Sequence, residues 1–218
     1  MQRMWKDRTE AGRRLAGLLG AYRSKPGVIV LALPRGGVVV GAEIASALGV
    51  PLDVLTVRKL GVPFQPELAM GAVASGGVRV LHEDLIRGFG ISREEVEAET
   101  ASEKRELTRR ERAYRGDRPP LDLAGKTVIL VDDGIATGAT MEAAISALRQ
   151  RKVARIVVGV AVGPADTITR LRTLADEVVC PLAPEQFSAL SLWYEAFPQT
   201  QDDEVKRLLS QVNSREEV

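Results

Sequence analysis

A buried strand that runs directly into two acidic residues is the feature of this sequence that most constrains its fold. Residues 128–131 are all apolar and three of them are β-branched, which is typical of a strand covered on both faces. Asp132 and Asp133 follow where such a strand would emerge. A short loop then leads into residues 141–148, which carry apolar side chains at helical spacing. This order predicts a parallel α/β sheet with a ligand site at its carboxyl edge.

The loop after the acidic pair has the chemistry of a phosphate site. Its backbone N–H groups precede a helix N-terminus, where unpaired amides and the helix dipole favour an anion. Thr137 and Thr140 add hydroxyl groups. Asp132 and Asp133 repel a phosphate, but they can accept hydrogen bonds from vicinal sugar hydroxyls or hold a divalent cation through water. The segment therefore predicts a sugar phosphate as the ligand.

Residues 128–140 resemble the signature of the type I phosphoribosyltransferases. In that signature an apolar strand, two acidic residues and two variable positions precede a small residue, Thr, Gly, any residue and Thr, and every position is present here. The resemblance implies binding of 5-phosphoribosyl-1-pyrophosphate (PRPP), with Asp132 and Asp133 facing the ribose hydroxyls. The loop that would hold the 5-phosphate consists of Ala136, Thr137, Gly138, Ala139 and Thr140. The alternative is an ordinary βα turn, whereas Walker and dinucleotide-binding loops do not fit the spacing.

A second unit of strand, loop and helix lies upstream. Residues 28–33 are apolar, and Pro34, Arg35, Gly36 and Gly37 separate them from a predicted helix that ends at Gly49. The two glycines permit close approach of the backbone to an anion, and a guanidinium can bind two of its oxygens. By the family resemblance, Arg35, Gly36 and Gly37 receive the pyrophosphate of PRPP. A purely structural turn is the alternative.

Two basic residues, Arg58 and Lys59, follow a third predicted strand at residues 51–57. Open α/β sheets bind ligands at the carboxyl ends of their strands. These two side chains can therefore close on the pyrophosphate, although a pair of solvated cations fits the sequence as well.

Residues 60–70 interrupt the apolar periodicity with one glycine and two prolines, which predicts an irregular, mobile loop. Their only carboxylate is that of Glu67, to which we assign, as a hypothesis, an acid–base role in catalysis. Two short strands, residues 69–74 and 78–81, then flank a diglycine turn and predict a β-hairpin. The resemblance implies that residues 58–82 form a flexible loop that covers the active site and excludes water.

A long charged helix is predicted for residues 92–115, because Ser92 and Glu95 form a capping-box pair. Acidic residues crowd its first half and arginines its second, which complements the helix dipole. The alternating charges favour a solvated or partner-facing helix over a nucleic-acid surface.

The predicted organisation is a core of residues 1–180, which includes the flexible loop and the inserted helix, and a small C-terminal hood and tail of residues 181–218. Four of the nine aromatic residues fall within residues 187–197. In the family a variable hood binds the acceptor, commonly a planar base. Packing of the hood is the favoured interpretation of these aromatic residues, and stacking on an acceptor ring is the alternative.

The composition restricts the class of protein. A formal charge of +1 provides no broad field for nucleic acid, so we expect none as a partner. Cys180 is the only cysteine, which excludes an intrachain disulfide and thiolate-rich metal sites. Residues 1–20 are charged throughout and no run of eighteen apolar residues occurs. We expect a cytoplasmic protein with no membrane partner.

The resemblance implies a PRPP-dependent pentosyltransferase of nucleotide metabolism that transfers the phosphoribosyl group to a nitrogenous acceptor, such as a nucleobase, and releases pyrophosphate. Its Mg²⁺ would be held by PRPP, through water to Asp132 or Asp133, without a direct protein ligand. In 6-oxopurine transferases an aspartate occupies the position of Ala136, which argues against guanine or hypoxanthine as acceptor. A homodimer is compatible with the family.

Two other functions fit the sequence. The first is a regulator that senses PRPP without turnover and acts on nucleic acid or a protein partner. The second is a sugar-phosphate hydrolase or pyrophosphokinase, which is less consistent because no second nucleotide site is evident.

Overall fold

The body of the protein is built on a five-stranded parallel sheet. The computed structural model describes residues 4–116 and 121–214, apart from the side chains of Pro66 and Glu67. The strand order is β2-β1-β6-β7-β8, and the strands are β1 (Val28–Ala32), β2 (Leu52–Val54), β6 (Thr127–Asp132), β7 (Arg155–Val160) and β8 (Glu177–Val179). Strands β1 and β6 are neighbours, with Val28 beside Thr127 and Ala32 beside Val131. The predicted parallel α/β sheet is confirmed.

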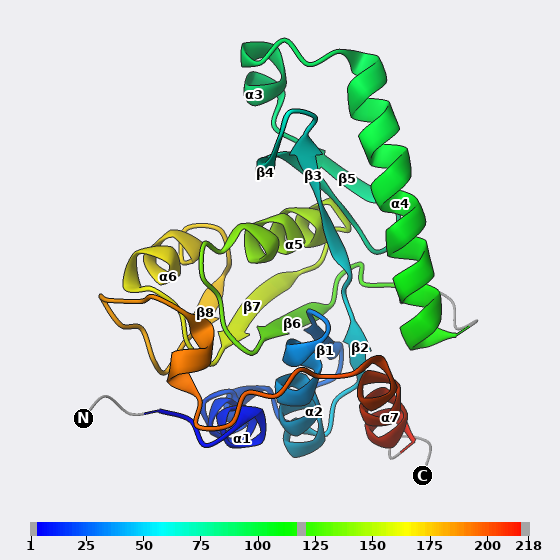
Figure 1. The fold of residues 1–218 in the computed structure, drawn as a ribbon. Helices are drawn as coiled ribbons and strands as arrows, with labels where there is room; N and C mark the ends of the chain where they lie inside the picture. The colour runs from blue at the N-terminus through cyan, green and yellow to red at the C-terminus, as the bar shows by residue number, and fades with distance from the viewer. Residues whose placement is uncertain (1–3, 117–120, 215–218) are drawn as a thin grey trace.

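Helices cover both faces of this sheet. Helices α1 (Arg8–Leu18), α2 (Gly36–Leu48) and α7 (Asp202–Asn213) lie on one face, and α5 (Ala139–Gln150) and α6 (Ala165–Leu171) lie on the other (Figure 1). Two short 3-10 helices, Gly20–Tyr22 and Leu190–Trp193, complete the body. The sheet is therefore doubly wound, as expected for a strand order that reverses within the sheet.

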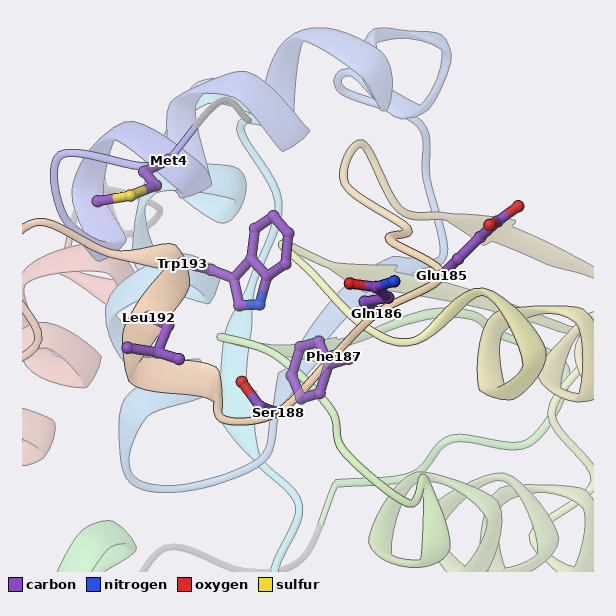
Figure 2. A pocket seen from close by; sticks show the side chains of 7 residues that line it. All are labelled: Met4, Glu185, Gln186, Phe187, Ser188, Leu192 and Trp193. Atoms are coloured by element: carbon purple, nitrogen blue, oxygen red, sulfur yellow. The ribbon is translucent and has the colours of Figure 1, made fainter. Parts of the chain in front are cut away.

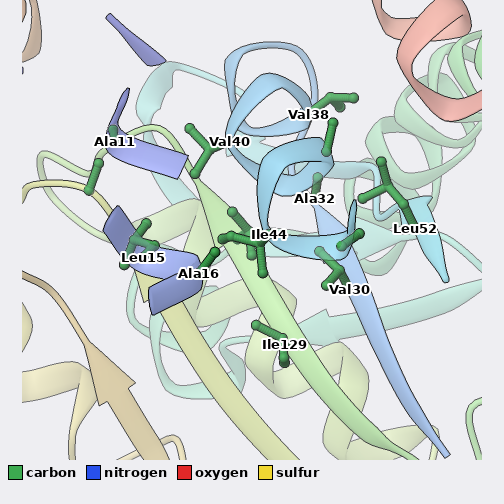
Figure 3. Close-up of a cluster of buried hydrophobic side chains, with 14 of the residues drawn as sticks. Ala11, Leu15, Ala16, Val30, Ala32, Val38, Val40, Ile44, Leu52 and Ile129 are labelled. Carbon is green, nitrogen blue, oxygen red and sulfur yellow. The ribbon is translucent and has the colours of Figure 1, made fainter. Parts of the chain in front are cut away.

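The core forms because side chains of a strand alternate between the faces of the sheet. Val30, Ala32 and Ile129 pack against α1 and α2, as Figure 3 shows. Ile29 and Leu130 point to the opposite face and pack under α5. Both faces are buried, so apolar residues occur consecutively along the strands. This packing fixes the carboxyl ends of β1 and β6 next to each other.

The second sheet belongs to a projecting part of the molecule that we call the arm, residues 57–115 (Figure 1). Its antiparallel strands are β3 (Val57–Val62), β4 (Gln65–Ala74) and β5 (Val78–Leu81), and its helices are α3 (Glu83–Gly88) and α4 (Arg93–Arg115). The arm has its own hydrophobic cluster, which includes Leu60, Val62, Met70, Val96 and Leu107. The hairpin predicted around the diglycine turn is confirmed.

The prediction of an irregular loop at residues 60–70 is wrong. Most of this segment forms the paired strands β3 and β4, with a register shift beside Gly61 that accommodates the glycine. Leu60 and Val62 pack in the cluster under α4, so their burial outweighs the local turn signals.

Helix α4 begins as predicted. The Ser92 N–H donates to Oε2 of Glu95 over 2.8 Å, and the Glu95 N–H donates to Oγ of Ser92 over 3.2 Å. At the other end of the helix, Arg115 forms an ion pair of 2.8 Å with Asp53 of β2, and both side chains are 8% exposed. This buried pair joins the end of the arm to the edge of the sheet. In the described part of the chain, no helix is both long and apolar enough to cross a membrane.

The C-terminal segment returns to the body before α7 begins. The backbone N–H of Trp5 donates to the backbone carbonyl of Trp193 over 2.9 Å. Trp193 and Tyr194 are buried. Helix α7 packs on α2 through Val205, which lies in the same hydrophobic cluster. The aromatic residues Trp193 and Tyr194 thus pack into the structure. The boundary between residues 180 and 181 stays a prediction.

Candidate active site

The two loops that the sequence singled out meet at the carboxyl edge of the sheet. Asp132 ends β6, and Gly36 and Gly37 form the first turn of α2. A Cβ atom on Gly36 would lie 2.0 Å from Oδ2 of Asp133, and one on Gly37 would lie 3.0 Å from Oδ1 of Asp132. Only glycine permits this contact. The acidic pair therefore lies against the N-terminus of α2, where the helix dipole stabilises negative charge.

Asp133 is held by a residue that the sequence analysis missed. Nε of Arg8 donates to Oδ2 of Asp133 over 2.6 Å, and both side chains are buried. The same guanidinium donates to the Pro198 carbonyl over 2.6 Å and lies 3.8 Å from the ring centroid of Phe197. The Tyr194 hydroxyl also donates to the Asp133 carbonyl. Helix α1 and the C-terminal segment thus fix the orientation of Asp133.

A signal for Arg8 was present in the sequence. Arg8 lies on the same buried stripe of α1 as Ala11 and Leu15. A charged side chain on a buried stripe is rarely without a partner of opposite charge. The stripe indicates that a partner exists, but no local pattern identifies that partner as Asp133.

Asp132 is half-buried as a residue, whereas Asp133 is buried. Oδ1 of Asp132 accepts a hydrogen bond from the Asp133 N–H over 2.9 Å. Burial raises the pKa of Asp132 well above its ordinary value, and the negative charge of Asp133 raises it further. A hydroxyl donor or a cation bound at Asp132 would favour its ionised form.

The loop after Asp133 borders a cavity and leaves backbone amides unpaired. This cavity has a volume of about 210 Å³ and is lined by Asp132 and residues 134–141. The carbonyls of Ala136 and Thr137 turn to α6, where they accept hydrogen bonds from Thr167 Oγ1 over 3.1 Å and Arg170 Nη2 over 2.5 Å. Among the described residues, the amides of positions 136–138 have no acceptor. Unpaired amides at a helix N-terminus are suited to an anion.

Arg35 precedes the first turn of α2, and its Nη1 atom lies 3.6 Å from Oδ1 of Asp202. Arg58, Lys59 and Glu67 lie in the arm. Nε of Arg58 donates to Glu103 of α4 over 2.5 Å, so this side chain is engaged within the arm. Lys59 lines a cavity of about 310 Å³ between the hairpin and α5, together with His82 and Thr140. Glu67 lies on β4, and its side chain is outside the described part of the structure. Lys59 is thus placed next to the loop at residues 136–140.

The loop also borders a larger hollow on the side of the C-terminal segment. A cavity of about 790 Å³ is lined by Ala136, Thr137 and Phe187. A neighbouring cavity of about 580 Å³ shares Phe187 and is lined on its other side by Met4 and Trp193 (Figure 2). The rings of Phe187 and Trp193 are parallel within 5°, with centroids 6.2 Å apart. The cavity of about 210 Å³ and the cavity of about 790 Å³ share Ala136 and Thr137 in their linings, and Phe187 is the aromatic residue that lines the larger one.

The carboxylate oxygens of Asp132 and Asp133 are ligands that Mg²⁺ prefers. In the described residues no three His, Cys, Asp or Glu side chains gather in the geometry of a metal site. The acidic pair is compatible with a magnesium ion that is held by a bound substrate and contacts the protein through water.

The sequence matches the family model described as "Phosphoribosyl transferase domain" over residues 8–192. The chain belongs to the phosphoribosyltransferase family. Two Mycobacterium tuberculosis proteins, one named "Putative phosphoribosyl transferase Rv0571c" and the other its counterpart in strain CDC 1551, are each 46% identical over 211 residues. Each match covers 97% of this chain and 47% of the relative. The chain thus spans about half the length of the curated relatives it matches.

A solved structure agrees with the fold. The crystal structure of TT1426 from Thermus thermophilus has a TM-score of 0.86 and 41% sequence identity, and the match covers 95% of this chain and 98% of that chain. The family and the fold class predicted from the sequence are confirmed. The roles of the individual site residues stay predictions.

Proposed function

We propose that this phosphoribosyltransferase transfers the 5-phosphoribosyl group of PRPP to a ring nitrogen of a nucleobase and releases pyrophosphate. The observation that supports it most is the cavity lined by Asp132 and by residues 136–138, whose amides have no acceptor among the described residues. A phosphate monoester bound to the amides would lie beside a carboxylate that can accept hydrogen bonds from a sugar. Family membership supports PRPP as the donor.

Each part of the site has a role in this reaction. The loop at residues 136–140 binds the 5-phosphate, and Asp132, which lines the cavity, orients the ribose hydroxyls. Asp133 is buried against Arg8 instead of lining this cavity, and its N–H donates to Oδ1 of Asp132. Arg35 and the first turn of α2 face the pyrophosphate and stabilise the charge that develops on it as the bond to the anomeric carbon breaks. A bound Mg²⁺ ion would neutralise further charge on the leaving group. Positioning of the two substrates accounts for most of the rate enhancement.

The hollow beside the loop is suited to the acceptor. Phe187 lies at the boundary of the two cavities, where its ring can contact a planar base. Ala136 is small and apolar, so it offers no carboxylate to a 6-oxopurine. These features favour a base other than guanine or hypoxanthine.

The arm supplies the cover and a candidate proton donor or acceptor. Its hairpin borders the cavity that contains Thr140 and Lys59, so a small movement of the hairpin would exclude water from the reacting carbon. Glu67 on β4 is the candidate for acid–base catalysis.

The direct test incubates the chain with PRPP and Mg²⁺ and a panel of nucleobases and amines, and measures release of pyrophosphate. We expect pyrophosphate to be released only when one particular acceptor is present. The Asp132→Asn variant should abolish this release. If PRPP binds but no acceptor causes release of pyrophosphate, the proposed transferase activity is contradicted and a regulator that senses PRPP is favoured. Failure to bind PRPP would overturn both.

A further inference from the structure

A cavity of about 390 Å³ beside Arg35 is almost entirely polar. Pro34 and Arg35 form one wall, and Arg109, Arg110 and Tyr114 of α4 form another. Asp202, the first residue of α7, completes the lining. Arg35 and two consecutive arginines of α4, which are distant from it in the chain, therefore line one space.

The two arginines of α4 are held in place by one carboxylate. Glu106 accepts hydrogen bonds from Nε of Arg109 over 2.8 Å, from Nη2 of Arg109 over 2.9 Å and from Nε of Arg110 over 2.8 Å. These bonds lower the pKa of Glu106 to about 2, so the carboxylate keeps its charge at neutral pH. The Nη groups of Arg110 have no acceptor among the described residues. An arginine that is already held by a carboxylate and still has N–H groups without an acceptor loses little side-chain entropy when it binds an anion.

Arg35 has a weak partner in the same cavity. Its Nη1 atom lies 3.6 Å from Oδ1 of Asp202, which is too long for a hydrogen bond. The same Oδ1 atom accepts a hydrogen bond of 3.0 Å from the Tyr114 hydroxyl. The side chain of Asp202 is 49% exposed, so it can turn to solvent when another anion approaches.

We propose that Arg109 and Arg110 join Arg35 in binding the pyrophosphate group of PRPP, and that Asp202 is the partner of Arg35 until PRPP arrives. The inference rests on the proposed function. A diphosphate carries more charge than one carboxylate, and its oxygens can bind guanidinium groups in pairs. Because α4 belongs to the arm, binding of the diphosphate links the arm to the body at the moment when the hairpin must cover the site.

The first test measures binding of inorganic pyrophosphate to the full chain by calorimetry. Charge-assisted hydrogen bonds are strong enough that each of Arg109→Gln and Arg110→Gln should weaken binding by about tenfold. Arg105→Gln is the matched control, because Arg105 is an exposed arginine of the same helix that does not line the cavity. Unchanged pyrophosphate affinity in the double variant of Arg109 and Arg110 would overturn the proposal.

The second test predicts a gain. Asp202→Asn removes the competing charge while keeping an acceptor for Tyr114, so pyrophosphate should bind roughly fivefold more tightly. A residue with only a structural role would not produce tighter binding. Weaker or equal affinity in Asp202→Asn would contradict the part of the proposal that concerns Asp202.

A competition experiment separates this inference from the proposed function. Saturating PRPP should prevent pyrophosphate binding in the parent chain, and pyrophosphate that binds beside PRPP would overturn the shared site. The combined variant Thr137→Val with Gly138→Val should lose PRPP binding but keep pyrophosphate binding. Normal turnover of PRPP by the parent chain, together with full affinity for pyrophosphate in the double variant of Arg109 and Arg110, would overturn the inference and leave the proposed transferase activity intact.

Discussion

Nε of Arg8 and Oδ2 of Asp133 are 2.6 Å apart, although the two residues are separated by 125 positions in the chain. Both side chains are 10% exposed, so the ion pair is shielded from water. Removing one partner of a buried pair leaves a charge without compensation. The contact therefore contributes both to the stability of the body and to the placement of an acidic side chain at the site.

We expect Arg8→Met to lower the free energy of unfolding by roughly 3 kcal/mol, because Asp133 would be buried without its partner. Urea denaturation followed by circular dichroism measures the change. Arg14→Met is the control, since Arg14 is exposed on the same helix, and it should change the free energy by less than about 0.5 kcal/mol. Equal urea midpoints for the two variants would show that the pair does not stabilise the fold.

Asp132→Asn should separate stability from activity. The raised pKa of Asp132 means that the folded chain binds the proton more tightly than the unfolded chain. The associated stability is fully present below the ordinary aspartate pKa of about 3.9 and is lost as the pH rises through the folded pKa. At pH 7 the variant should thus resist urea better than the parent, and the difference should shrink towards pH 4. Its rate of pyrophosphate release should fall by orders of magnitude.

Asp176→Asn is the control, because the pKa of Asp176 is shifted in the opposite direction to that of Asp132. Hydrogen bonding to Arg149 lowers the pKa of Asp176. Its stability contribution is therefore present above the ordinary pKa and is lost as the pH falls through the lowered value. We expect this variant to be less stable than the parent at pH 7 and to show normal turnover. A stability difference for Asp132→Asn that does not depend on pH would rule out the assigned shift.

Gly138→Ala should abolish PRPP binding. Gly138 has a φ of +81°, and a Cβ atom there would lie 2.7 Å from Cγ2 of Thr167. The loop must move to relieve this contact, which displaces its amides from the cavity. Gly77→Ala is a matched control, because Gly77 has a φ of +79° with no atom near the added Cβ. Both variants should lose about 1–2 kcal/mol of stability, but calorimetry should detect loss of PRPP binding for Gly138→Ala alone.

Glu67→Gln tests the acid–base hypothesis. If Glu67 transfers a proton during catalysis, the variant should lose about 100-fold or more in kcat with little change in the KM for PRPP. The steady-state rate of pyrophosphate release at saturating PRPP provides the measurement. A normal kcat would remove Glu67 from the mechanism.

The sheet and the loop after β6 could be predicted from the sequence because their signals are local. A run of four apolar residues, two carboxylates and a helix at regular spacing occupy one continuous segment, residues 128–148. The position of β3 could not be predicted, because Gly61 and Pro63 dominate the local pattern. That strand is stabilised by pairing with β4 and by burial of Leu60 under α4.

The contacts between distant segments could not be predicted for a similar reason. The charged sequence of α4 indicates a solvated helix, and only its packing against the body brings Arg109 and Arg110 beside Arg35. Likewise, a buried cation on α1 predicts some acidic partner, but the fold decides that the partner is Asp133.

The ion pair between Arg115 and Asp53 has an evolutionary consequence. It places the point where the chain leaves the body for the arm next to the point where it returns. The entropic cost of closing a chain segment such as the arm grows only slowly with the length of the segment. Strands β1 and β6 pair directly with each other, so their register does not depend on the residues between them. Descendants of this chain can therefore shorten, extend or exchange the arm while the parallel sheet keeps its strand order.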